Sequence, residues 1–224
     1  MTRIAFILFT SVSMGEIYSG IVGSPSLHWI SKPLIMVTLG LYYFFNATYR
    51  STVVWLAIFF SFLGDTTLML ESRDSVFFMV GLSAFLIAHI FYILSYGQYQ
   101  DESEDNALKG IQKIRIAFPI ILAGTGLLVV LYPTLGDLKI PVVIYALVLI
   151  VMVLNAVFRF GRTNNNSFWL VFGGSLLFMI SDSLLAINKF LTPVPSAGVW
   201  IMSSYMLAQF LIIQGLCVHV NNQK

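Results

Sequence analysis

Residues 51–70 read STVVWLAIFFSFLGDTTLML, an apolar run long enough to cross a lipid bilayer that nevertheless carries an acid, Asp65. A helix spans the hydrocarbon with about 20 mostly apolar residues. An ionised carboxylate in that setting costs roughly 2.5–3.5 kcal/mol on insertion scales. A second acid, Asp182, lies in a similar run, FMISDSLLAINKF at 178–190. Intramembrane acids of this cost usually serve a function.

The composition of the whole chain is that of a polytopic membrane protein. Of its 224 residues, 58% are hydrophobic and 10% are charged, whereas a soluble domain has about 25% charged residues. The single cysteine, Cys217, excludes an intrachain disulfide framework. The net charge is +2, and the chain has no basic patch large enough to indicate a nucleic-acid partner.

The apolar runs predict an all-α fold with eight transmembrane helices in one integral membrane domain, residues 1–224. The first run follows Arg3 as a signal peptide would, but Glu16 and the bulky residues after it make a poor cleavage site, so we expect a retained helix. The longest connection, 97–114, is expected to be a cytoplasmic loop joining two halves, roughly 1–96 and 115–224. The predicted spans are roughly 4–22, 31–46, 52–70, 76–96, 115–132, 140–159, 168–190 and 198–219.

The distribution of basic residues predicts the orientation in the membrane. An even number of spans puts both termini on one side. Eight Lys and Arg residues share the terminal side and four lie on the other, which favours cytoplasmic termini. Five aromatic residues near predicted helix ends are expected to form interfacial belts. They are Trp29, Tyr42, Tyr43, Trp169 and Trp200.

The two halves resemble each other weakly. RIAF at 3–6 is matched by RIAFPI at 115–120, Asp65 by Asp182, and Ala88-His89 by Ala208-Gln209. A repeat of four helices would run parallel to its partner, about a pseudo-twofold axis along the membrane normal. Chance similarity among apolar helices is the alternative.

Such a repeat would bring polar side chains together near the non-cytoplasmic ends of the helices. At 1.5 Å per residue, Asp65 lies roughly 8 Å before Leu70, and Asp182 roughly 12 Å before Phe190. Two buried carboxyls in different environments can serve as acid and base. Glu16, Lys32 and Tyr205 are expected in the same pocket. His89 is expected deeper, at the floor of the pocket or below it, and Tyr92 lies on the same face of its helix.

Less specific interpretations remain open for each of these residues. Asp65 and Asp182 could have a purely structural role, in which they form hydrogen bonds or salt bridges with neighbouring helices, for instance with Lys32 or Lys189. Glu16 could simply reach the interface, and His89 could be an ordinary packed residue. The sequence has no HExxH motif or Cys/His cluster with metal-site spacing, so we expect no metal or cofactor.

Taken in order, these motifs resemble the YhhN-like lysoplasmalogenase family of eight-helix membrane proteins. The resemblance covers nearly the whole chain, and the combination of Gly-Asp, Ala-His-x-x-Tyr, Ser-Asp and Tyr-x-Leu-Ala-Gln is more specific than any one of them. The stretches that carry it are SKPLIM (31–36), FLGDTTLML (62–70), FFMVGLSAFLIAHIFYILSY (77–96), IPVVIYALVLIVM (140–152), GGSLLFMISDSLLAINKF (173–190) and SYMLAQFLI (204–212).

The resemblance implies hydrolysis of the vinyl ether bond of a lysophospholipid, giving a fatty aldehyde and a glycerophospho-alcohol. It places the family's two aspartates on Asp65 and Asp182. We expect Asp182, the deeper of the two, to be the acid and Asp65 the base, and the same reaction could proceed with these roles exchanged. Because the family extends into bacteria, we expect a bacterial inner-membrane protein in contact with membrane lipid. The supporting positions that it implies are Lys32, His89, Tyr92, Tyr145, Tyr205 and Gln209.

Two other functions fit paired intramembrane acids. An intramembrane aspartyl protease would carry Gly-x-Gly-Asp and Tyr-Asp, but Phe62 stands in place of the first glycine and Ser181 in place of the tyrosine. A proton-coupled transporter or lipid-binding protein would use the acids as a relay. A transporter needs access from both faces, however, and the predicted acids cluster towards one.

Overall fold

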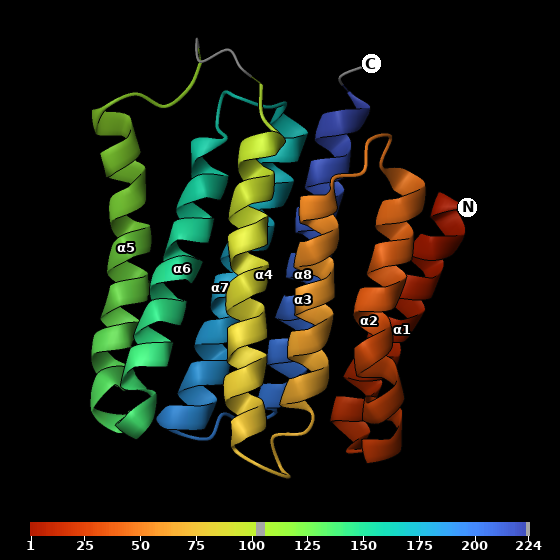
Figure 1. The fold of residues 1–224 in the computed structure, drawn as a ribbon, viewed down its shortest axis with the longest axis vertical. Helices are drawn as coiled ribbons and strands as arrows, with labels where there is room; N and C mark the ends of the chain where they lie inside the picture. Colours follow the sequence, from red (N-terminus) through yellow and green to blue (C-terminus); the bar gives the residue numbers. More distant parts are fainter. Residues whose placement is uncertain (102–105, 223–224) are drawn as a thin grey trace. The chain divides into compact units, whose positions relative to one another are not determined.

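The computed structural model describes residues 1–101 and 106–222, and the regular elements within these ranges are all helical (Figure 1). Eight long α-helices follow one another with short connections, and two short 3-10 helices, Tyr132–Thr134 and Gly136–Leu138, lie between the fifth and the sixth. The long helices are α1 (Thr2–Val22), α2 (Pro25–Asn46), α3 (Thr52–Leu68), α4 (Val76–Gln98), α5 (Ile111–Leu131), α6 (Lys139–Phe158), α7 (Asn165–Phe190) and α8 (Ala197–Asn221).

The predicted all-α class and the eight helices are confirmed, with some helix ends moved. The largest shift is at α2, which begins at Pro25 rather than near residue 31. Ser24 has an extended backbone and Pro25 occupies the first turn, where the missing N–H of proline and its fixed φ suit a helix start. In the predicted loop 97–114, α4 continues to Gln98 and α5 begins at Ile111, while residues 102–105 lie outside the described part.

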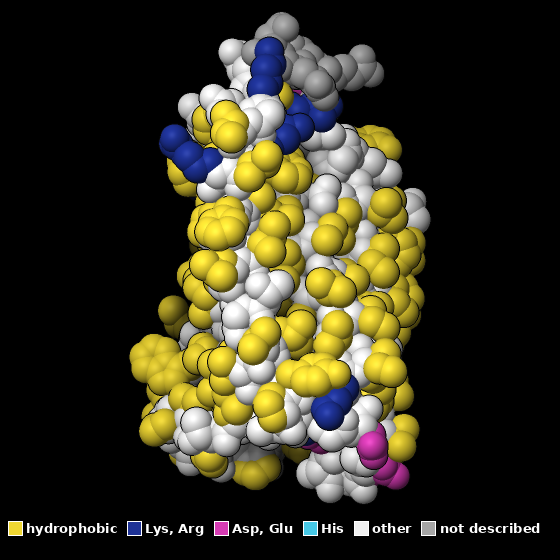
Figure 2. Space-filling model, turned by 90° about the vertical axis from the view of Figure 1, so that its left-hand side faces the viewer, with side chains coloured by type: hydrophobic (Ala, Val, Ile, Leu, Met, Phe, Trp, Pro, Cys, Tyr) yellow, Lys and Arg dark blue, Asp and Glu magenta, His cyan; other side chains and the backbone are white. Residues whose placement is uncertain are grey.

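Six of the segments are long and apolar enough to cross a membrane, so this is an integral membrane protein. α3 is apolar but has only 17 residues. The face shown in Figure 2 carries hydrophobic side chains along its middle, and its charged side chains lie towards the two ends, with Lys and Arg gathered at the upper end and both basic and acidic side chains at the lower end. The six segments are Thr2–Val22, Val76–Gln98, Ile111–Thr134, Gly136–Phe158, Asn165–Phe190 and Ala197–Asn221.

The chain forms two compact units, Met1–Ser95 and Tyr96–Gln223, and their boundary lies within the last turn of α4. In the first unit, α2 packs against both α1 and α3. In the second, α6 packs against both α5 and α7, and the pairing of α7 with α8 is the most extensive.

Small residues allow the close approach of α7 and α8. A Cβ on Gly174 would lie 2.9 Å from the Ala208 carbonyl oxygen and 2.8 Å from the Ile212 side chain, whereas one on Gly173 would meet nothing within 4 Å. Only one of the two adjacent glycines therefore faces α8. Small residues at helix interfaces let the backbones come together in this way.

Of the five residues expected in an aromatic belt, the three tryptophans are exposed and the two tyrosines are not. The side chains of Trp29, Trp169 and Trp200 are exposed, but Tyr42 and Tyr43 are buried. The Tyr43 hydroxyl accepts a hydrogen bond from the backbone N–H of Ser51 at 2.9 Å. Tyr43 thus binds the start of α3 from the end of α2 instead of anchoring the helix at the interface.

Candidate functional site

The acid of the second unit, Asp182, is held by a phenol from the neighbouring helix. The Tyr145 hydroxyl of α6 donates a hydrogen bond of 2.5 Å to Asp182 Oδ2 on α7. Tyr145 is buried and Asp182 is half-buried. The two helices run in opposite directions, and the pair lies about 9 Å from the start of α6 and about 12 Å from the end of α7. A short connection between α6 and α7 therefore brings both residues to the same depth.

Tyr205 and Gln209 of α8 lie beside this part of α7. The ring of Tyr205 meets that of Phe178 edge-on at a centroid distance of 5.5 Å, and Phe178 is one helical turn before Asp182. The Gln209 side-chain amide donates to the Tyr205 hydroxyl at 3.3 Å. Ser181, next to Asp182, donates to the Ile201 carbonyl of α8 at 3.0 Å. The α7–α8 contact therefore fixes the rotation of the turn that carries Asp182.

The acid of the first unit, Asp65, is buried near the end of α3. Its neighbour Gly64 faces α4, because a Cβ there would come within 2.6 Å of the Phe85 ring. His89 and Tyr92 follow Phe85 on α4 at helical spacing, and both are fully buried. His89 lies one turn, about 6 Å, beyond the level of Phe85. His89 therefore lies farther along α4 than the point at which α4 meets Gly64.

Glu16 is buried rather than reaching the interface, and both of its carboxyl oxygens have partners from α2. His28 Nδ1 lies 2.7 Å from Oε1, and the Ser31 hydroxyl donates to Oε2 at 2.5 Å. Lys32, the next residue of α2, is half-buried. The first unit thus holds Glu16 within the α1–α2 hairpin.

His28 and Ser31 were not among the predicted site residues, although the sequence contains a signal for them. Glu16 precedes the turn at Gly23 by two helical turns, and His28 and Ser31 follow it by similar distances. Residues equally far from a tight reversal lie at similar depth in antiparallel helices. An acid and a histidine in that relation, both in apolar runs, are candidates for pairing.

The predicted site residues divide between the two units. Within the units, the structure joins Tyr145 to Asp182 and Tyr205 to Gln209, and gives Glu16 partners that were not predicted. Within the described residues, no three His, Cys, Asp or Glu side chains are grouped as a metal ion would need. The first unit holds Glu16, Lys32, Asp65, His89 and Tyr92, and the second holds Tyr145, Asp182, Tyr205 and Gln209.

Comparison with known proteins gives one family. Residues 27–216 match the model of the YhhN family. Human lysoplasmalogenase TMEM86B is 30% identical over 156 residues, which are 70% of this chain and 59% of the relative. Human lysoplasmalogenase TMEM86A is 30% identical over 168 residues, 72% of this chain and 64% of the relative.

A bacterial relative matches as well. The lysoplasmalogenase of Mycobacterium tuberculosis is 31% identical over 140 residues, 62% of this chain and 50% of the relative. No solved structure matches the chain. The chain spans about three-fifths of the length of the human relatives. Because the family model covers most of its residues, the chain belongs to the YhhN family.

Proposed function

We propose that this chain is a membrane hydrolase that cleaves the vinyl ether bond of lysoplasmalogens, giving a fatty aldehyde and a glycerophospho-alcohol. The names of its human and mycobacterial relatives support the substrate class. The observation that carries the proposal is the 2.5 Å hydrogen bond from Tyr145 to Asp182. Oδ1 of this carboxyl accepts no hydrogen bond from the described residues, and we assign the proton transfer to it.

The first step is transfer of a proton from Asp182 Oδ1 to the β-carbon of the vinyl ether. The electrons of the carbon–carbon double bond form the new C–H bond, and the ether oxygen stabilises the resulting oxocarbenium ion. Negative charge develops on Asp182 during this step, so the hydrogen bond from Tyr145 to Oδ2 strengthens. An interaction that is stronger in the transition state than in the ground state accelerates the reaction.

The second step is addition of water to the cationic carbon, with Asp65 as the base that accepts a water proton. The hemiacetal then collapses. Asp65 returns its proton to the departing glycerol oxygen, Asp182 takes the hemiacetal hydroxyl proton, and both residues regain their starting states. An acid and a base flanking a water resemble the arrangement of inverting glycoside hydrolysis.

The remaining predicted residues have supporting roles in this proposal. Tyr145 is already bound to Asp182, which leaves Lys32 as the residue for the lipid phosphate. Tyr205 and Gln209 keep α8 in register with the Asp182 turn. Glu16, His89 and Tyr92 support the helices of the first unit, and the alkyl chain lies between helices, in contact with membrane lipid.

We also propose eight transmembrane spans in a four-plus-four repeat. α2 has 22 residues and α3 has 17, which correspond to roughly 33 and 26 Å. In both units, the residue before the acid faces the following helix: Gly64 packs towards α4 and Ser181 bonds to α8. Bacterial inner-membrane localisation with cytoplasmic termini completes the proposal, and reporter fusions at each loop test it.

The test is aldehyde release from a lysoplasmenyl-ethanolamine by purified full-length protein in detergent, with an ester-linked lysolipid as the control substrate. Wild type should release aldehyde from the vinyl ether and leave the ester intact. Asp65→Asn and Asp182→Asn should each lower turnover by roughly 10²–10⁴-fold. Asp137→Asn is the matched control, because Asp137 is an exposed acid outside the long helices. A turnover rate close to that of wild type after either of the first two changes would rule out this mechanism.

A further inference from the structure

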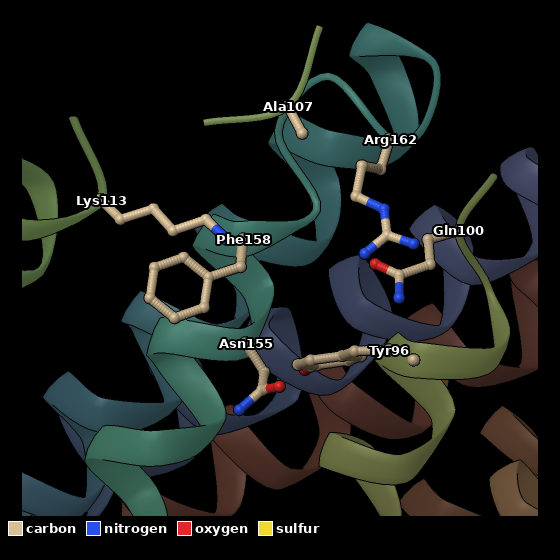
Figure 3. Close-up of a pocket in the computed structure, with 8 residues that line it drawn as sticks. Tyr96, Gln100, Ala107, Lys113, Asn155, Phe158 and Arg162 are labelled. Carbon is tan, nitrogen blue, oxygen red and sulfur yellow. The ribbon is translucent and has the colours of Figure 1, made fainter. Parts of the chain in front are cut away.

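The second unit contains a polar pocket that the proposed reaction does not use. It has a volume of about 220 Å³ and lies where the last turn of α4, the first turn of α5 and the last turn of α6 meet (Figure 3). Arg162 and Gln100 face each other across it in this view, with Asn155 and Tyr96 below them. The lining residues are Tyr96, Gly97, Gln100, Ala107, Lys113, Asn155, Phe158 and Arg162.

The walls of this pocket are built by specific contacts. Gly161 has a φ of +73°, and a Cβ there would lie 1.9 Å from the Asn106 carbonyl oxygen, so only glycine lets the chain before α5 lie on this turn. The backbone N–H of Asp101 donates to the Arg162 carbonyl at 2.6 Å. The Arg162 guanidinium donates to the Asp101 carbonyl at 3.3 and 3.4 Å. These contacts hold the Arg162 side chain at the pocket.

Two of the side chains that line the pocket are cationic. Lys113 and Arg162 line it, and Lys113 Nζ lies 5.5 Å from the centroid of the Phe158 ring. A third cation, Arg159, lies behind the wall, with its guanidinium carbon 6.0 Å from the centroid of Tyr96. A phosphate fits such a lining, because arginine, lysine and side-chain amides can all donate to its oxygens.

Arg159 is buried, and the Asp101 carboxylate is near enough to act on its charge. The Arg159 side chain is 1% exposed, and it donates to the Tyr99 carbonyl at 2.7 and 3.2 Å and to the Ser167 hydroxyl at 3.0 Å. Its Nη1 is buried with no hydrogen-bond partner in the described part of the chain. Burial lowers the pKa of this guanidinium to about 10, so it stays charged at neutral pH. The Asp101 carboxylate opposes this lowering of the pKa, and an anion bound in the pocket would further offset the cost of burying the charge.

The pocket is too far from the Tyr145–Asp182 pair to hold the phosphate of a substrate reacting there. Asn155 and Phe158 follow Tyr145 on α6 by 10 and 13 residues, or roughly 15 and 20 Å along the helix. In a lysoplasmalogen, only a glycerol unit separates the ether oxygen from the phosphate, which is much shorter. This separation from the reaction rests on the proposed function, but the charge and shape of the pocket do not.

We propose that this pocket is a second ligand site, which binds a phosphate group at the membrane surface. The phosphate belongs either to the headgroup of an anionic phospholipid or to a soluble phosphoester, and both would meet Lys113 and Arg162. Basic pockets between transmembrane helices are typical binding sites for anionic headgroups.

The experiment measures thermal unfolding of the full-length protein in neutral detergent at constant ionic strength. One series adds phosphatidylglycerol, with phosphatidylcholine of the same chains as its control. A second adds sodium phosphate, with sodium chloride as its control. Stabilisation by phosphatidylglycerol alone would identify a lipid headgroup site, and stabilisation by both anions a site open to soluble phosphate. Absence of stabilisation by either would overturn the proposal.

Variants separate the pocket from general surface charge. Lys113→Gln and Arg162→Gln should each weaken the apparent affinity about tenfold, the effect of losing one hydrogen bond to a charged group. Arg115→Gln is the matched control, because Arg115 is exposed two residues from Lys113 and is not part of the lining. Lys113→Gln leaves the Arg162–Asp101 contacts intact and should fold even if Arg162→Gln does not. Equal weakening by Arg115→Gln and Lys113→Gln would also overturn the proposal.

Discussion

Glu16 and Asp182 are both acids within apolar helices, yet they differ in their hydrogen-bond partners and in their burial. Glu16 in the first unit has partners on both oxygens, His28 on one and Ser31 on the other. Asp182 in the second unit accepts from Tyr145 through Oδ2 and is half-buried, whereas Glu16 is buried. Both carboxyl oxygens of Glu16 are therefore bound within the α1–α2 hairpin, whereas Asp182 is bound by α6 through Oδ2.

This difference shows why an intramembrane acid is not by itself a sign of catalysis. A carboxylate whose two oxygens are bound to a histidine and a hydroxyl of another helix holds the two helices together. Transfer of a proton to or from that carboxylate would disrupt these hydrogen bonds. A carboxyl oriented through one oxygen can exchange a proton through the other. The partners of each acid, more than its burial, determine which role it can perform.

The largest expected effect separates the two acids by activity. Asp182→Asn should lower aldehyde release by roughly 10²–10⁴-fold, the usual contribution of a general acid, whereas Glu16→Gln should leave it within about threefold of wild type. Initial rates on purified, folded variants measure both. A loss at Glu16→Gln as large as that at Asp182→Asn would remove the distinction between the two regions.

Removal of one hydroxyl tests whether Tyr145 acts through Asp182. Tyr145→Phe should lower kcat by about 10–100-fold with little change in KM, because a hydrogen bond to a charged group contributes about 1.5–3 kcal/mol. Tyr132→Phe is the matched control, because Tyr132 is exposed at the end of α5. If kcat were unchanged in Tyr145→Phe, the hydroxyl would have no part in the proton transfer.

Glu16→Gln should lower the stability of the protein although it leaves the activity nearly unchanged. Glu16→Gln should reduce the free energy of unfolding by about 1–2 kcal/mol, because the amide cannot accept from both His28 and Ser31 as a carboxylate does. Thermal unfolding in detergent measures this, with Glu71→Gln as a control at an acid outside the helices. An unchanged midpoint would show that the hairpin does not depend on the buried pair.

The smallest expected effect comes from removing a single partner of Glu16. Ser31→Ala should cost about 0.5–1.5 kcal/mol of unfolding free energy, the net worth of one intramolecular hydrogen bond, and should leave aldehyde release unchanged. Thermal unfolding and initial rates on the same preparation give both values. A fall in rate without a fall in stability would place the α1–α2 hairpin in the reaction.

The sequence by itself determined the number of helices, their approximate bounds and the presence of acids within them. These features are local, because the length and apolarity of each run decide whether it forms a long apolar helix. The Glu16–His28 pairing could also have been predicted from the sequence, since both residues lie at similar distances from the turn at Gly23. The start of α2 was missed because Pro25 was not recognised as a first-turn proline.

Tertiary structure alone decided which side chains meet. The Tyr145–Asp182 bond depends on the rotation of α6 against α7, and the burial of Tyr42 and Tyr43 depends on the packing at the end of α2. Arg159 is one of the eight basic residues assigned to the terminal side of the membrane, and the structure buries it beside Tyr99 and Ser167. Helix rotation and partner choice arise from side chains far apart in the chain, because they depend on how whole helical faces fit together.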